Sequence, residues 1–213
     1  MARSPIRWKV EMDYSNESID VETTGLLVFD LYESARESIE KRGILEPVLR
    51  LLAGCREHGL PIFFTRPVHR ADGLDLAQTV PDMDRDHQHY GHDRPYPRVP
   101  HVVAGSPETL PLREFNFGPA DYDITKHRWS AFCGTSLDMS LRTRGIKTLL
   151  VVGGTTHIGV ASSVYAARDL DYQIVVVRDG CHGTPAELSS LLDDIFPQIC
   201  HVLTVDEVLS QLK

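Results

Sequence analysis

The stretch Thr148-Leu-Leu-Val-Val-Gly-Gly-Thr-Thr-His-Ile-Gly-Val-Ala-Ser-Ser163 decides the fold of this chain. Its all-apolar run, Leu149 to Val152, is typical of a parallel strand that is covered on both faces. Gly153-Gly154 ends the run, because glycine permits backbone angles that are closed to other residues. Apolar residues then recur at helical spacing as far as about residue 171. A strand, glycine turn and helix in this order are either a plain connection in an α/β domain or a site where helix-start amides bind an anion.

Strands and helices alternate through the rest of the chain. This alternation predicts a three-layer α/β/α fold with a doubly wound, mainly parallel sheet. Residues 1–23 are interpreted as a polar N-terminal arm, and residues 24–213 as a single domain. Thr184, with Glu187 three residues later, predicts a capping box at a helix start. Further strands are expected at residues 25–30, 60–66, 120–126, 172–178 and 201–204, and further helices at 44–58, 135–145, 184–196 and 205–213.

Composition excludes several classes of function. The chain has 213 residues, of which 42% are hydrophobic, enough for one domain with a core. The net charge is 22 − 30 = −8, with no basic block, so neither nucleic acid nor an anionic membrane is an expected partner. No apolar run approaches the ~18 residues of a membrane span, and the start lacks the apolar core of a signal peptide. The 4 cysteines lack CxxC spacing and are read as reduced thiols in a cytoplasmic protein.

Two charged residues stand where predicted strands end. Asp30 ends the first strand and Lys126 ends the third, and the Gly153–Gly159 turn follows the fourth. In parallel sheets, ligands bind at the carboxyl ends of the strands. Asp30 and Lys126 are therefore either a catalytic acid/base pair acting on a small-molecule substrate or a structural ion pair.

The motifs around these residues resemble those of the isochorismatase-like (cysteine hydrolase) superfamily over residues 24–210. The resemblance implies that family's fold, with a Rossmann-like strand order, and it implies catalytic roles for Asp30 and Lys126. It rests on the segments Leu26–Asp30, Thr125–Phe132 with Gly134, Thr135 and Leu137, Gly153–Val160, Val175–Asp179 and Thr204–Val208.

The chain departs from the amide-hydrolysing members at their nucleophile. That position is occupied by Gly159, and glycine cannot attack a carbonyl. Cys133 would attack from a different wall of the pocket, away from the oxyanion donors. Isochorismatases also lack the cysteine and are similar to this chain in the string His157-Ile158-Gly159. The resemblance to them implies that Asp30, as an acid, protonates a vinyl ether and that water traps the resulting cation.

The resemblance also suggests substrate contacts. A non-proline cis peptide is expected between Gly154 and Thr155, and it would aim amides of the turn into the pocket. Arginine suits a carboxylate substrate. The candidate substrate-binding residues are Gly154, Thr155, Thr156, His157, Trp129 and Arg66, with Arg94 and Arg98 as further candidates for a carboxylate.

No metal and no cofactor are expected. Nicotinamidase-type members bind a metal through Asp and His after the second strand, whereas Arg66-Pro-Val-His69 keeps only the histidine. His87, His89 and His92 are spaced as metal ligands can be, but they are interpreted as part of a polar loop. This loop belongs to the long irregular segment 67–120, which is expected to be functional.

Three readings of the function stay open at this point. Hydrolysis of a small carboxylate by Asp30, Lys126 and water is preferred. In the second reading, Asp30 activates water against an amide or carbonyl compound. In the third, the chain is an inactive ligand-binding or assembly protein. After Asp30 the chain reads Leu31-Tyr-Glu-Ser in place of the Met-Gln of many members, so the pocket wall differs. A dimer or tetramer of identical chains is expected.

Overall fold

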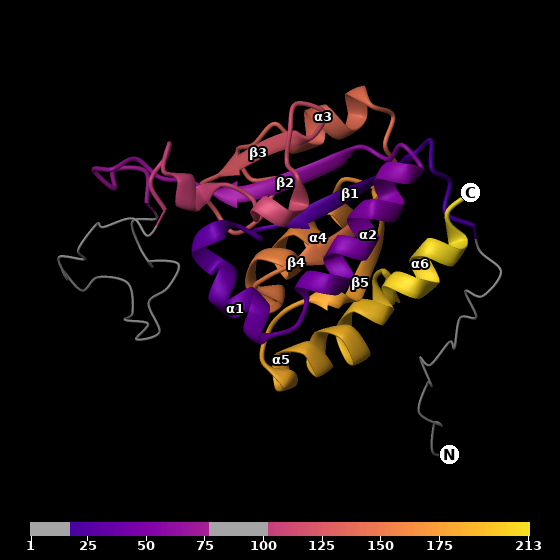
Figure 1. The fold of residues 1–213 in the computed structure, drawn as a ribbon. Coiled ribbons are helices and arrows are strands. Elements are labelled where there is room, and N and C mark those ends of the chain that lie inside the picture. Colours follow the sequence, from indigo (N-terminus) through magenta and orange to yellow (C-terminus); the bar gives the residue numbers. More distant parts are fainter. Residues whose placement is uncertain (1–17, 77–101) are drawn as a thin grey trace, which may run out of the picture.

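The computed structural model describes residues 18–76 and 102–213, which fold around one sheet (Figure 1). Its strands lie in the order β3-β2-β1-β4-β5-β6, and all neighbours are parallel. The chain enters the sheet at its centre and winds first to one edge and then to the other, which confirms the predicted doubly wound arrangement. The strands are β1 Thr24–Phe29, β2 Ile62–Pro67, β3 Tyr122–Lys126, β4 Thr148–Gly153, β5 Gln173–Cys181 and β6 His201–Leu203.

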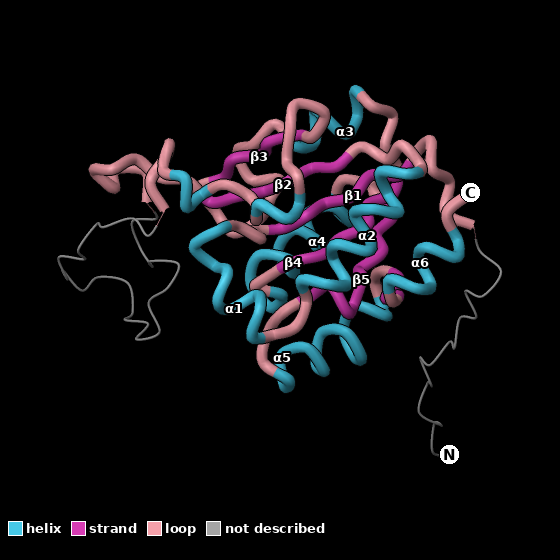
Figure 2. Tube along the Cα trace, viewed as in Figure 1, coloured by secondary structure: helices cyan, strands magenta, loops and turns pink. Residues whose placement is uncertain are grey.

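Helices cover both faces of the sheet (Figure 2). The capping box of Thr184 and Glu187 is present, but the helix that it starts is regular only to Ser189 and continues as a wider π-type turn over Ser190–Ile195. The sequence did not predict α1, because this short helix buries only Ile39 and so has no apolar period. The helices are α1 Arg36–Lys41, α2 Leu45–Glu57, α3 Leu137–Thr143, α4 Ala161–Asp169, α5 Pro185–Ser189 and α6 Val205–Gln211.

Successive residues of each strand point to opposite faces and supply two hydrophobic clusters. In β1, Leu26 and Val28 pack in the cluster that holds the apolar residues of α2 and α6. Leu27 and Phe29 pack in the other cluster, with α3 and α4. This alternation confirms the three-layer α/β/α architecture, and it sends the last side chain of β1, Phe29, toward α4.

The N-terminal segment is joined to the end of the chain. The Ile19 amide donates to the Gln211 carbonyl at 2.8 Å, and the Lys213 amide donates to the Ile19 carbonyl at 3.1 Å. The packed part of the chain thus includes residues that precede the predicted boundary at residue 24. Of the irregular segment 67–120, residues 77–101 lie outside the described part, and with them His87, His89, His92, Arg94 and Arg98.

Two further observations concern the described residues as a whole. None of their helices combines the length and the apolar character that crossing a membrane requires. Each of the four cysteines is a free thiol, and Cys55 and Cys181 are buried.

Candidate active site

A buried ion pair lies at the carboxyl edge of the sheet. Asp30 directly follows β1, and Lys126 is the last residue of β3. Since β2 lies between these strands, the lysine side chain reaches over it, and its Nζ lies 2.7 Å from Asp30 Oδ2. The two side chains are only 13% and 5% exposed, which removes most of the solvent screening between the charges. The structure thus brings the two predicted catalytic residues into direct contact.

The second oxygen of the Asp30 carboxylate also has a donor. Thr65 of β2 donates its hydroxyl to Asp30 Oδ1 at 2.9 Å, and the Asp30 amide donates to the Thr65 carbonyl at 3.1 Å. Asp30 has φ 52°, a left-handed conformation that aspartate tolerates better than most residues. With a donor on each oxygen, the resting site favours the ionised carboxylate. Thr65 could not be assigned from the sequence, because only the strand register places it beside Asp30.

The ammonium group of Lys126 has two more neighbours. It donates to the Arg128 carbonyl at 3.2 Å and lies 4.7 Å from the centre of the Phe29 ring. A buried ammonium needs such partners, because its desolvation costs several kcal/mol. Asp30, Arg128 and Phe29 therefore hold Lys126 in one place.

The Gly153–Gly159 turn packs against the end of β1. The Gly154 amide donates to the Phe29 carbonyl at 3.1 Å, and the Gly154–Thr155 peptide bond is cis. The amides of Thr156 and Gly159 already donate to the carbonyls of His182 and Thr155, each at 3.0 Å. Within the described part of the chain, the Thr155 N–H makes no backbone hydrogen bond. The same holds for the His157 N–H, so these two amides remain the candidates for binding a substrate oxygen.

Three of the predicted substrate-binding side chains are held by other residues. His157 places Nδ1 3.1 Å from Glu187 Oε2. Thr156 is fully buried and donates its hydroxyl to the His182 carbonyl at 2.7 Å. Arg66 forms a two-point ion pair with Asp123, at 2.8 and 2.6 Å, and a third bond to Thr109 at 2.9 Å.

Those three bonds of Arg66 join β2 to β3 and to the irregular segment between these strands. A substrate carboxylate would therefore have to displace Asp123 before this guanidinium group could bind it. Trp129, in contrast, is 46% exposed just beyond Lys126.

Two residues, one near the pair and one beside the turn, were not predicted from the sequence. Burial and the negative charge of Asp30 raise the pKa of Tyr32 to about 12, which keeps its phenol neutral beside the carboxylate. The His182 ring lies against Gly154, where a side chain would come within 2.6 Å of its Cε1. Burial, with the nearby positive charge of Arg42, lowers the pKa of His182 to about 4. In the sequence, Tyr32 stands out only as part of the string Leu31-Tyr-Glu-Ser, and His182 belongs to no motif.

The partly buried His182 makes stability depend on pH. Its pKa is lowered on folding, so the unfolded chain takes up the proton first as pH falls from about 6.5 to 4. We predict that unfolding free energy falls by about 2 kcal/mol over this window and that His182→Gln removes this part of the loss. Urea titrations at several pH values measure it, with the exposed His58→Gln as the matched control. Equal pH slopes in all three proteins would contradict the assignment.

A group of potential metal ligands lies after β2 and β3. Ligand atoms of His69, Asp75 and His127 all lie within 4.8 Å of one another, so these residues could hold a metal ion. Asp75 and His127, however, already have hydrogen-bond partners in the protein. His127 Nδ1 lies 2.6 Å from the Val68 carbonyl, and both Asp75 oxygens accept from the Arg70 amide. His69 Nδ1 lies 3.4 Å from Asp75. These contacts hold the segment after β2 against the residue that follows β3. The absence of a metal stays a prediction.

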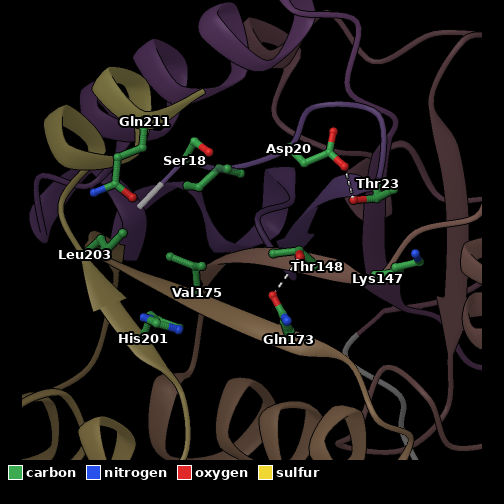
Figure 3. Close-up of a pocket in the computed structure, with 11 residues that line it drawn as sticks. Ser18, Asp20, Thr23, Lys147, Thr148, Gln173, Val175, His201, Leu203 and Gln211 are labelled. Carbon is green, nitrogen blue, oxygen red and sulfur yellow. Dashed lines mark hydrogen bonds between the residues drawn. The ribbon is translucent and has the colours of Figure 1, made fainter. Parts of the chain in front are cut away.

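A further pocket lies at the amino ends of the strands, opposite the edge that holds Asp30 and Lys126 (Figure 3). There Thr148 and Gln173, the first residues of β4 and β5, are hydrogen-bonded to each other, and Asp20 accepts from the Thr23 hydroxyl. None of the residues around the Asp30–Lys126 pair lines this pocket. It is lined by Ser18, Ile19, Asp20, Thr23, Lys147, Thr148, Gln173, Val175, His201, Leu203 and Gln211.

Comparisons with known proteins agree with this geometry. The family model described as "Isochorismatase domain" matches residues 19–207. The uncharacterised isochorismatase family protein YecD of Escherichia coli is 31% identical over 91% of this chain and 98% of its own length. The uncharacterised isochorismatase family protein YwoC of Bacillus subtilis is also 31% identical, over 92% of this chain and 97% of its own.

Solved structures are similar in the same way. An isochorismatase family protein from Desulfovibrio vulgaris superposes with a TM-score of 0.73 at 27% identity, over 88% of this chain and 98% of that chain. The family model covers nearly the whole described domain, and both relatives align over almost their full length. The chain therefore belongs to the isochorismatase family of hydrolases.

Proposed function

We propose that this protein hydrolyses a small carboxylate substrate by adding water without a covalent enzyme intermediate, and that a vinyl ether is the favoured bond. Asp30 is the general acid or base, and Lys126 positions it and stabilises charge. The observation that carries the proposal is the buried contact of 2.7 Å between these side chains, next to a turn in which position 159 has no side chain. Such a site has acid–base groups but offers no nucleophile in the turn.

In the proposed reaction, Asp30 enters the cycle with a proton and delivers it to the vinyl carbon, and water attacks the resulting oxocarbenium ion. The attacking water returns a proton to Asp30. The hemiketal that forms then breaks its C–O bond to the leaving oxygen and releases a ketone and an alcohol. Lys126 and Thr65 both favour the ionised carboxylate before substrate binds. An anionic substrate beside the pair opposes that ionised form and moves Asp30 toward its acid role.

The same two hydrogen bonds favour one alternative. A carboxylate that rests ionised is a general base, and it can activate water against an amide or another carbonyl compound. In that case the N–H of Thr155 or of His157 would bind the oxygen on which negative charge develops.

A substrate panel separates these functions. Pyruvate release from isochorismate is expected for the vinyl-ether reaction, and ammonia release from small carboxylate amides is expected for the alternative. Calorimetric binding of a panel compound without any turnover would instead identify an inactive, ligand-binding member of the family. The predicted dimer or tetramer and the cytoplasmic location stay predictions.

A further inference from the structure

The place of the missing side chain at position 159 is filled by an aromatic ring. A Cβ atom on Gly159 would lie 2.5 Å from Cζ of Phe29 and closer still to Cε1. Real side chains do not approach so closely, so one of the two groups would have to move. Phe29 is 1% exposed and packed among the residues between the sheet and α4, which leaves its ring little room.

The same ring also supports the catalytic lysine. Lys126 Nζ lies 4.7 Å from the ring centre while it contacts Asp30. The face of an aromatic ring attracts an ammonium group, and more strongly where both are removed from water. Phe29 thus contacts the turn and Lys126, and it directly precedes Asp30 in the chain.

We propose that Phe29 is the specificity-determining residue of this site: its ring closes position 159 to any side chain and positions Lys126 for acid–base chemistry. The inference rests on the proposed function. A site in which position 159 is closed to a nucleophile can act only on substrates that react by proton transfer and attack of water. Its first half, the steric closure, can be tested without any substrate.

A double-mutant cycle in thermal unfolding tests the closure. Gly159 lies in the helical segment Thr156–Val160 without a positive φ, where alanine would normally stabilise the fold. We expect G159A to lower Tm by roughly 5–10 °C, because the added methyl group meets the ring. Phe29→Leu removes the ring atoms that are in the way. In the F29L background, G159A should therefore leave Tm unchanged or raise it.

Phe63→Leu is the matched control, because Phe63 is fully buried in the same cluster and belongs to the neighbouring strand. In the F63L background, G159A should still lower Tm by as much as it does in the wild type. Additive effects in the F29L background, or a harmless G159A in the wild type, would overturn the inference.

Enzyme kinetics test the second part of the proposal, that Phe29 positions Lys126. With the substrate that the panel identifies, F29L is expected to lower kcat about tenfold with KM unchanged, whereas F63L keeps kcat. An unchanged kcat in F29L would remove the role in positioning. A wild type without turnover would refute the proposed function, and the Tm cycle would still decide whether Phe29 closes position 159.

Discussion

Asp30→Asn is expected to lower kcat/KM by about 10³-fold or more, because the amide can neither donate nor accept the transferred proton. The substitution keeps the size of the side chain and its place at the end of β1. It also leaves the Lys126 ammonium buried without its counter-charge, which we expect to cost about 3 kcal/mol of stability. Turnover of the panel substrate and urea unfolding are therefore measured on the same samples.

The loss of stability is separated from the loss of catalysis by a second variant. Asp30→Asn with Lys126→Met removes both charges, so stability should largely return while turnover stays absent. Asp206→Asn is the matched control, since this exposed carboxylate of α6 makes the same change of charge away from the site. If the Asp30→Asn protein is folded and keeps wild-type turnover, the acid–base role of Asp30 is wrong.

Gly153→Ala is expected to destabilise the fold by about 4 kcal/mol or to prevent folding. Gly153 has φ 119°, and a Cβ there would overlap the carbonyl oxygen of Phe29 and lie 2.8 Å from its carbonyl carbon. Both contact atoms belong to the backbone of β1, which is paired with β4 and cannot turn aside as a side chain can.

Gly145→Ala is the control for this prediction. Gly145 also has a positive φ, of 69°, but no atom lies within 4 Å of the position that a Cβ would take. It should cost only about 1 kcal/mol, the conformational penalty without the collision. Chemical denaturation measures both variants. Equal losses in the two variants would show that the contact with Phe29 contributes nothing.

Strong local signals account for what could be predicted. The apolar runs in β1, β4 and β5 predicted a buried parallel sheet, and the capping box of Thr184 predicted a helix start that the structure contains. α1 was missed because only Ile39 is buried in it. The helix expected over residues 184–196 is a regular α-helix only to Ser189 and continues as a π-type turn. No residue pattern in the sequence predicted this change.

The candidate site was predicted in part. Asp30 follows β1 and Lys126 ends β3, two strands that are not neighbours in the chain or in the sheet. The rule that ligands bind at the carboxyl ends of parallel strands still placed both residues at the same edge. Arg66 looked available for a substrate carboxylate, whereas Asp123 and Thr109 hold its guanidinium group. The sequence names a charged residue but does not show which partner already holds it.

The sequence by itself determined the order of the strands and of the helices other than α1, the charge balance and the absence of a side chain at position 159. These features depend on the identity of single residues and on short-range periodicity. Tertiary structure alone decided that Thr65 bonds to Asp30, that His182 lies against Gly154 and that the Phe29 ring fills the space at Gly159 while it supports Lys126. Those contacts join segments far apart in the chain, and only strand register and close packing bring them together.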